Sequence, residues 1–397
     1  MLENYERLAT GRHHSLFAND LEAHAPALLA ALQGSRVAVI GAAGSIGMAV
    51  VKTLLRFKLG AVTLFDLDEN GLVEVVRDLR ATPGVQLPVD FQALPIAIGS
   101  WEFARYFADT KPFDYILNLS AMKHVRSEKD PYSLARLLKN NVLFLDEFLS
   151  SLSYSPRKVF SVSSDKATNP ANLMGASKMA MEKVLNFHSD RLPYSTARFA
   201  NVAFSKGSLP FGFLQRIEKG QPLSAPSDVR RFFMSHEEAG QLCVLACVLG
   251  ANREVFFPKL ECCFNEKTFS SIAEDLLKHL GFVPLLCASE KEAIDSASRV
   301  IADKKWPCYF TKSDTSGEKE FEEFFDPKQD VDFLRFESMG VIRGQNWETA
   351  SIQNFLKFLK GLPQLAQMQK SVFVQELLKV VPELKHIETG KSLDQKM

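Results

Sequence analysis

The sequence lacks an excess of charge of either sign. Its 397 residues include 47 Lys and Arg and 47 Asp and Glu, so the formal net charge is zero at pH 7. A chain without a net field has no general attraction for nucleic acid or for an anionic membrane surface. We therefore expect no nucleic-acid partner, and any anion that the protein binds must meet a local site.

Cysteines and long apolar runs are also scarce. The cysteines are Cys243, Cys247, Cys262, Cys263, Cys287 and Cys308. They form no paired CxxC units with a matching His cluster, so we expect buried reduced thiols and no metal site. No run reaches the roughly 18 apolar residues of a membrane helix, and MLENYERLATGRHH has no apolar signal-peptide core. These absences predict a soluble, cytoplasmic protein without a membrane partner.

Short apolar runs that end in Gly, Asp, Asn or Ser begin at Arg36 and alternate with amphipathic stretches. The runs cover residues 36–40, 61–66, 113–120, 158–164 and 194–202. Continuous apolar runs of this length are typical of parallel strands that helices cover on both faces. The pattern predicts an α/β fold with a doubly wound parallel sheet.

A glycine-rich turn follows the first of these runs. In RVAVIGAAGSIGMAV, Gly41, Gly44 and Gly47 stand between a predicted strand and the start of a predicted helix, with Ser45 and Ile46 between the last two glycines. Such glycines let the backbone approach a pyrophosphate, while the helix N-terminus supplies N–H groups and the positive end of its dipole. The turn predicts a dinucleotide-binding site.

Asp66 ends the next predicted strand, 19 residues after Gly47. This is the spacing of a carboxylate that hydrogen-bonds the adenosine ribose in a Rossmann-like fold. A carboxylate binds two ribose hydroxyls but repels a 2'-phosphate, and LFDLDEN offers no Arg in its place. The sequence therefore favours NAD over NADP as the cofactor.

We divide the chain into four predicted parts. Residues 1–33 form a helical prefix, and residues 34–206 form the NAD-binding Rossmann domain with the catalytic segment. The alternation of strands and helices breaks down near Gly207, so residues 207–345 form a smaller mixed α/β substrate lobe, whose elements can join the first domain. Residues 346–397 are helical, and their leucine-rich pieces predict a packing or oligomer surface, so we expect a homo-oligomer.

Four stretches of the chain resemble a known family. They are AMKHVRSEKDP (121–131), SSDKATNPANLMGASKMAMEKV (163–184), RFANVAFSKGSLP (198–210) and VRRFFMS (229–235). From about residue 36 to 250 the sequence resembles the extended short-chain dehydrogenases/reductases that act as UDP-N-acetylglucosamine 4,6-dehydratases or capsular polysaccharide biosynthesis proteins. Short-chain enzymes place a Tyr four residues before Lys178, whereas here Met174 stands there. In one branch of the family a Met occupies this position.

The resemblance implies a reaction in three stages. NAD takes a hydride from C4 of the sugar, water leaves across C5 and C6, and the hydride returns to C6, which gives a 4-keto-6-deoxy sugar. By the same resemblance, Asp165 protonates the leaving hydroxyl and Lys166 takes the C5 proton, and the two roles can be exchanged. Ser164 orients the substrate, and Lys178 binds the nicotinamide ribose and favours an alkoxide at O4.

Met174 leaves one step open, because a thioether cannot move a proton at neutral pH. Two groups are candidates to take the proton of the 4-hydroxyl: Asp165, or a water molecule held by Lys178.

The resemblance also assigns residues to the two ligands. Lys123 and His124 line the cofactor and the sugar, Asn118 replaces a family His, and Ser100 replaces an Asp that contacts adenine. The set expected to bind the sugar diphosphate is Asn201, Lys206, Arg230 and Arg231. An additional residue before the two arginines leaves open which of them binds the diphosphate, and UDP, GDP, CDP and dTDP all remain open.

In the stretch WPCYFTKSDTSGEKEFEEFF (306–325), the residues Ser313, Asp314, Thr315 and Gly317 have the composition of a turn or helix cap. The stretch is either a cap on the second lobe or a lid over the sugar.

Three functions compete on this evidence. The first is a 4,6-dehydratase for surface glycan or nonulosonic acid synthesis, and the second is a nucleotide-sugar epimerase that returns the hydride to its starting carbon. The third is a non-catalytic NAD-binding subunit, which Met174 alone would favour.

Overall fold

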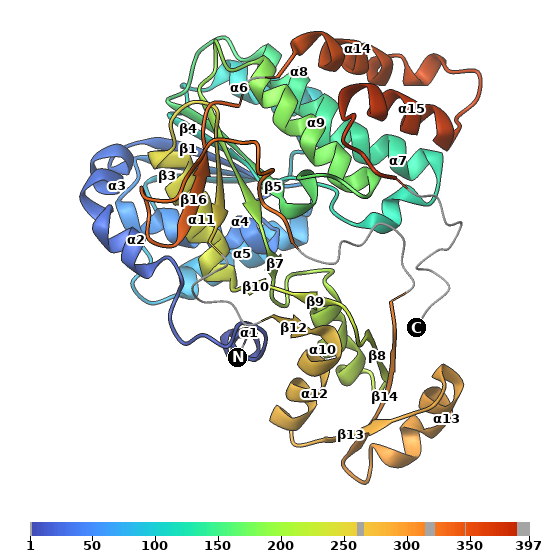
Figure 1. Ribbon diagram of the computed structural model, residues 1–397. Coiled ribbons are helices and arrows are strands. Elements are labelled where there is room, and N and C mark those ends of the chain that lie inside the picture. Colours follow the sequence, from blue (N-terminus) through green and yellow to red (C-terminus); the bar gives the residue numbers. More distant parts are fainter. Residues whose placement is uncertain (1, 260–265, 314–321, 346, 387–397) are drawn as a thin grey trace.

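The computed structural model describes residues 2–259, 266–313, 322–345 and 347–386, and its centre is a large, mostly parallel sheet (Figure 1). The strand order is β15-β16-β11-β6-β5-β4-β1-β2-β3. The strands are β1 (Arg36–Ile40), β2 (Ala61–Phe65), β3 (Asp90–Leu94), β4 (Tyr115–Asn118), β5 (Lys158–Ser164), β6 (Tyr194–Phe199), β11 (Glu254–Pro258), β15 (Val331–Asp332) and β16 (Met339–Ile342). Among the described strands of this sheet, only the β11–β16 and β15–β16 pairs are antiparallel. The predicted doubly wound α/β fold is confirmed.

Helices cover both faces of the sheet and give it two separate cores. Alternate residues of β1 face opposite ways, so Val37 and Val39 belong to one core and Ala38 and Ile40 to the other. The first core includes α3 (Ala25–Leu32), α4 (Ser45–Leu54), α5 (Glu69–Ala81) and α11 (His236–Leu249). The second includes α6 (Trp101–Asp109), α7 (Pro131–Leu138), the π-helical turn Lys139–Leu143, α8 (Phe144–Ser151) and α9 (Leu173–Phe187).

The C-terminal helices pack outside this second layer. Both α14 (Thr349–Lys360) and α15 (Lys370–Val380) contact α9 (Figure 1). Their apolar residues Phe355, Leu359, Phe373 and Leu377 are buried, so these faces serve intramolecular packing. Among the described residues, no helix combines the length and apolar character needed to span a membrane.

A smaller lobe lies below the main sheet in Figure 1. Its parallel strands are β8 (Leu223–Pro226), β13 (Val283–Leu286) and β14 (Lys305–Thr311), and its helices are α10 (Leu209–Glu218), α12 (Phe269–His279) and α13 (Glu290–Val300). The lobe is not continuous in sequence, because β11, β15 and β16 return to the main sheet. The predicted division into four ranges remains a prediction.

Two short strand pairs connect the lobes near the carboxyl ends of β5 and β6. Strand β7 (Asn201–Val202) pairs with β10 (Phe233–Met234), and β9 (Arg230–Arg231) pairs with β12 (Lys267–Thr268).

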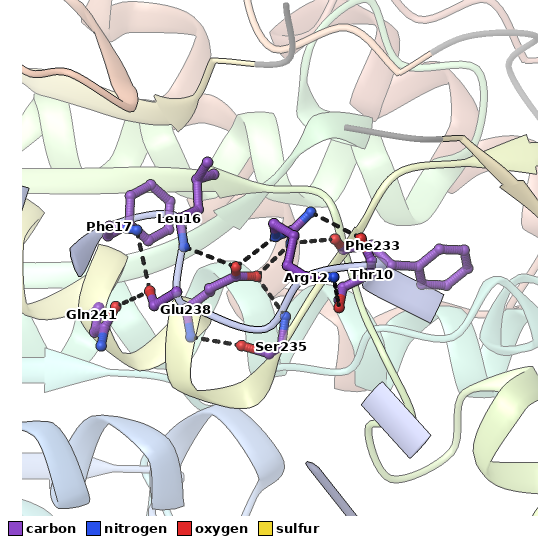
Figure 2. A network of polar contacts seen from close by, with 9 residues as sticks. Thr10, Arg12, Leu16, Phe17, Phe233, Ser235, Glu238 and Gln241 are labelled. Carbon is purple, nitrogen blue, oxygen red and sulfur yellow. Dashed lines mark hydrogen bonds and ion pairs between the residues drawn. The ribbon is translucent and has the colours of Figure 1, made fainter. Parts of the chain in front are cut away.

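The N-terminal prefix consists of α1 (Leu2–Thr10), α2 (Ala18–Ala23) and α3, and an ion pair ties it to α11 (Figure 2). The Arg12 guanidinium donates to both carboxylate oxygens of Glu238, at 2.8 and 2.6 Å, and to the Phe233 carbonyl oxygen at 2.9 Å. Glu238 also closes a capping box with Ser235 at the start of α11. The prefix therefore fixes the connection between β10 and α11. Phe233 on β10 lines the candidate site described below.

The described cysteines are reduced, as expected. Cys243, Cys247 and Cys308 are buried and Cys287 is half-buried. Burial raises the pKa of each of the three buried thiols, so they remain inert at neutral pH. Cys262 and Cys263 lie outside the described residues.

Candidate active site

The glycine turn between β1 and α4 leaves no room for side chains at two of its positions. Gly41 has φ +82°, and a Cβ there would lie 2.6 Å from the Ser120 backbone nitrogen. A Cβ on Gly47 would lie 2.1 Å from the Gly41 carbonyl oxygen. Helix α4 begins at Ser45, so its first N–H groups lie directly after this turn. This is the geometry that a pyrophosphate requires.

Asp66 follows the last residue of β2 and is held against the same turn. Its Oδ2 accepts a hydrogen bond from the Ala43 N–H at 2.8 Å, and its Oδ1 accepts one from the Asp68 N–H at 3.0 Å. These bonds fix the carboxylate beside the glycine turn, at the carboxyl end of the strand where a ribose is expected.

Two predicted ligand-binding residues make structural contacts of their own. Ser100 is the N-cap of α6, and its Oγ accepts from the Phe103 N–H at 3.2 Å. Lys206 packs against the glycine turn from another part of the chain. Its N–H donates to Ser45 Oγ at 2.9 Å, and its Nζ donates to the Ala43 carbonyl oxygen at 3.2 Å. Their predicted contacts with adenine and with the sugar diphosphate stay predictions.

A cavity of about 380 Å³ opens beyond this turn, at the carboxyl ends of β1, β5 and β6. Most of the predicted site residues line it: Gly41, Gly44, Ser45, Ile46, Gly47, Lys123, His124, Ser164, Asp165, Lys166, Met174, Lys178 and Asn201. A larger cavity of about 750 Å³ reaches Gly44 and Ser45 from the side of α1 and α11, but its lining includes none of the predicted catalytic residues. The smaller cavity is therefore the candidate active site.

Asp165 and Lys166 form an ion pair inside this cavity. The Lys166 Nζ lies 3.1 and 3.2 Å from the two carboxylate oxygens of Asp165, and the Ser164 hydroxyl donates to Asp165 Oδ1 at 2.7 Å. The Asp165 side chain is only 6 % exposed and that of Lys166 is 31 % exposed. Since a solvated loop pair would expose both side chains, the geometry favours a role in the site over a surface ion pair.

The loop that carries this pair packs tightly on the first turn of α9. A Cβ on Gly175 would lie 2.2 Å from the Lys166 carbonyl oxygen, so only glycine allows this approach. Asn172 caps the helix by accepting from the Gly175 N–H at 2.8 Å. The glycine and the cap together fix Lys166 relative to Met174.

Met174 and Lys178 lie one turn apart on α9, on the face that lines the cavity. Met174 is buried, and its N–H donates to Glu128 Oε1 at 2.7 Å. The Lys178 Nζ donates to the Val162 carbonyl oxygen at 2.9 Å. Burial lowers the pKa of Lys178 to about 8, although the charge of Glu182 acts in the opposite direction. Near neutral pH, Lys178 can therefore change its charge, whereas the thioether at 174 cannot.

Lys123 and His124 reach the cavity from the loop after β4. Burial lowers the pKa of both groups, and the charges of Lys123 and Arg126 lower that of His124 further. The His124 ring lies against Gly207, where an added Cβ would come within 2.8 Å of it. A neutral imidazole in this position can donate or accept one hydrogen bond without adding charge.

The two predicted arginines differ in their surroundings. Arg231 is buried, whereas Arg230 is exposed on the same short strand, β9. The Arg231 guanidinium donates to the Arg230 carbonyl oxygen at 2.7 Å, and neither arginine is among the residues that line the cavity. Their predicted role in binding the diphosphate stays a prediction.

Glu322 is the site residue that sequence reasoning missed. Its Oε2 accepts from the Phe232 N–H at 2.8 Å, and its other carboxyl oxygen accepts from the Asn201 side-chain amide. Glu322 belongs to the stretch 306–325, which the sequence marks only as a cap or a lid, and no motif distinguishes Glu322 from Glu320 and Glu323 beside it. The turn residues Asp314, Thr315 and Gly317, on which the cap and lid hypotheses rest, lie outside the described residues.

Comparison with known proteins agrees with the motifs. Residues 37–298, well over half of the chain, match the family described as polysaccharide biosynthesis protein. The chain belongs to this family. The match confirms the resemblance that the motifs indicated.

Curated members and relatives include both dehydratases and epimerases. The chain is 29% identical over 232 residues to the probable polysaccharide biosynthesis protein EpsC of Bacillus subtilis. This alignment covers 57% of this chain but only 38% of EpsC. It is 25% identical over 248 residues to a UDP-N-acetylglucosamine 4,6-dehydratase (inverting) of Campylobacter jejuni, covering 57% of this chain and 67% of that protein. It is 27% identical over 229 residues to a UDP-glucose 4-epimerase of Rickettsia typhi, covering 56% and 65%.

Among solved structures, Pen from Bacillus thuringiensis has the same fold. The TM-score is 0.62 at 19% identity, and the alignment covers 84% of this chain and 99% of Pen. The likeness supports the architecture of the two lobes.

Proposed function

We propose that this protein is a nucleotide-sugar 4,6-dehydratase that converts UDP-N-acetylglucosamine to a 4-keto-6-deoxy sugar nucleotide for surface glycan synthesis. The observation that carries the proposal is the Asp165–Lys166 pair, which lies in a cavity that begins at the glycine turn. Water elimination needs both an acid and a base beside the sugar. A simple 4-epimerase needs no base at C5, so the pair favours the dehydratase.

NAD fits the residues at the glycine turn. Gly41 and Gly47 leave the backbone open to the pyrophosphate, α4 begins there, and Asp66 is held ready for the adenosine ribose. When bound, NAD would accept the hydride from C4 and return it to C6. Lys178, four residues after Met174, would hold the nicotinamide ribose.

Asp165 and Lys166 would carry out the proton transfers. In its neutral form, Lys166 takes the proton from C5 and returns it to C5 when the hydride reaches C6. Asp165 protonates the departing 6-hydroxyl, and Ser164, which already donates to Asp165, orients the sugar. A charged Lys178 favours an alkoxide at O4. The proton of the 4-hydroxyl then passes to Asp165 or to a water molecule held by Lys178.

The diphosphate of the substrate would lie toward the second lobe. Asn201 on β7 lines the cavity, and Arg231 is the buried arginine of β9, so we take Arg231 as the arginine for the diphosphate. An arginine fork matches phosphate oxygens better than a lysine does. Relatives named for UDP sugars support UDP as the nucleotide.

The mass of the product separates the three candidate functions. Purified protein would be incubated with UDP-N-acetylglucosamine and its GDP, CDP and dTDP counterparts, and the products analysed by mass spectrometry. A dehydratase lowers the mass of the sugar nucleotide by one water. An epimerase leaves this mass unchanged and alters the configuration of the sugar, and the similarity to an epimerase of Rickettsia typhi is the reason to test for it. Protein that carries NAD and changes no sugar nucleotide would indicate a non-catalytic subunit.

Replacing Asp66 by alanine should weaken NAD binding about ten- to a hundredfold. The loss follows from about 1.5 to 3 kcal/mol for hydrogen bonds to a charged group. Asp66→Arg should shift the preference toward NADP, because a cation replaces an anion at the 2' position. Isothermal titration with both cofactors measures the change. Asp68→Asn, which keeps the cap on α5 that Asp68 makes with the Gly71 N–H, is the control, and equal affinities of Asp66→Ala and this control would contradict the assignment.

A further inference from the structure

The N-terminal prefix passes from the core of one lobe to the core of the other. Ala9, near the end of α1, is fully buried in the core of the smaller lobe, and α1 contacts α12 and β10. Phe17 is fully buried in the first core of the main sheet. Residues 10–16 therefore form a strap between the lobes that is anchored at both ends.

Arg12 lies in the middle of this strap and is held by Glu238 on α11 (Figure 2). Its guanidinium donates to both carboxylate oxygens, and the side chains of Arg12 and Glu238 are only 13 % and 2 % exposed. The Leu16 N–H, further along the strap, donates to the same carboxylate at 3.0 Å. Because a bidentate pair fixes geometry as well as charge, the guanidinium has a defined orientation relative to α11.

The same guanidinium satisfies the second edge of β10. The carbonyl oxygens on either side of Phe233 accept from the N–H groups of Asn201 and Ala203, at 3.2 and 2.8 Å, and so join β10 to β7. The Phe233 carbonyl oxygen between them accepts instead from Arg12, at 2.9 Å. Arg12 thus occupies the place that a neighbouring strand would otherwise take, and this two-residue strand is hydrogen-bonded on both edges.

Strands β10 and β7 contribute one wall of the candidate active site, formed by Phe233, Asn201 and Phe269. Phe233 pairs in register with Asn201, and all three residues line the cavity. The Phe233 ring meets the Phe269 ring edge-on, with centroids 5.8 Å apart and 88° between the planes. A shift of β10 would therefore move the side of the cavity expected to contact the sugar nucleotide. The residues expected to bind NAD lie elsewhere, at the ends of β1 and β2.

Resting on the proposed function, we propose that Arg12 is a positioning residue for the sugar nucleotide. It acts through the Phe233 carbonyl oxygen and holds β10 against β7, so that Phe233 and Asn201 form their wall before the substrate arrives. Preorganisation of this kind contributes to affinity, because binding then needs no further ordering of the site. Loss of the contact should weaken binding of the sugar nucleotide and leave binding of NAD unchanged.

Arg12→Met in a Glu238→Gln background tests this contact. Removal of Arg12 alone would leave a buried, unpaired carboxylate, which strongly destabilises a protein by itself. Glutamine at position 238 removes that charge and still suits the capping box of α11, while methionine fills irregular space without offering a donor. The double variant is compared with Glu238→Gln. Arg7→Met in the same background, at an exposed arginine of the prefix, is the matched control.

UDP is the binding probe, because it cannot react. Isothermal titration measures the affinity of each NAD-loaded variant for UDP, and a separate titration measures the affinity for NAD. We expect the double variant to bind UDP about tenfold more weakly than Glu238→Gln, the effect of losing a hydrogen bond to a charged group. Its affinity for NAD should equal that of Glu238→Gln, and the Arg7 control should match Glu238→Gln in both titrations.

Hydrogen exchange tests the wall without any ligand. The N–H groups of Asn201 and Ala203 donate to β10, so exchange in residues 201–203 should be faster in the double variant than in Glu238→Gln. Unchanged exchange there would overturn the proposal. Equal affinities for UDP, accompanied only by a lower melting temperature, would show that Arg12 merely stabilises the fold, and an equal loss of NAD affinity would show an effect beyond the wall. Either result would also overturn it.

None of these measurements requires turnover. If UDP binding responds as expected but UDP-N-acetylglucosamine is not dehydrated, the proposed function fails and the role of Arg12 stands. If the sugar nucleotide is dehydrated and its KM is the same in the double variant and in Glu238→Gln, the function stands and the role of Arg12 fails. A parent protein that binds neither UDP nor UDP-N-acetylglucosamine would overturn both.

Discussion

Lys166→Ala should lower dehydratase turnover by a factor of about 10² to 10⁴, the range for removal of a general acid or base. Its amine lies 3.1 Å from Asp165 Oδ1 in the cavity, and its side chain is partly exposed. Truncation therefore leaves no large buried hole, and the fold should remain intact. The measurement is turnover at saturating NAD, with circular dichroism to verify folding.

The same variant also locates Lys166 in the reaction sequence. Hydride transfer from C4 should survive, so reduced nicotinamide should become visible by its absorbance without release of product. Lys305→Ala, on the exposed start of β14, is the matched control and should turn over as the parent does. Parent-like turnover in Lys166→Ala would remove Lys166 from the mechanism.

Asp165→Asn should be severely impaired, whereas Met174→Tyr should be neutral or slower. The amide of Asn cannot take a proton, and it also loses the ion pair with Lys166. At position 174 the side chain is buried, so a phenol must fit a tighter space and find a hydrogen-bond partner. An unsatisfied buried hydroxyl costs about 1 to 3 kcal/mol.

The two variants must be compared under saturating NAD. If an inactive parent gains strong dehydratase activity through Met174→Tyr, the natural protein has lost its base, and the non-catalytic alternative would replace the function proposed here. Loss of activity in Asp165→Asn together with no gain in Met174→Tyr supports proton transfer through Asp165.

Local patterns predicted the centre of the fold well. The runs at 36–40 and 158–164 match β1 and β5, because strands buried on both faces are continuously apolar. Strand β3 was missed, since DFQAL at the sheet edge is only half-buried and mixes polar with apolar residues. Strand β16 was missed because it is defined by its antiparallel pairing with β11, about eighty residues earlier in the chain.

The same distinction applies to the site. The glycine turn and Asp66 lie within one strand-helix-strand unit, so spacing alone predicted them. The different burial of Arg231 and Arg230 arises on β9, which pairs with β12 more than thirty residues later in the chain, so local spacing could not distinguish the two arginines. Glu322 depends on the contact between Arg198 and Phe324, which are 126 residues apart, and no local pattern encodes such a contact.

The most direct test of the central claim is to follow a deuterium atom placed at C4 of UDP-N-acetylglucosamine. A 4,6-dehydratase removes the hydride from C4 and delivers it to C6 of the same sugar, so the product should carry deuterium in its new methyl group and be one water lighter. Nuclear magnetic resonance and mass spectrometry of the product report both. Deuterium that remains at C4 in a product of unchanged mass would contradict the dehydratase and indicate an epimerase.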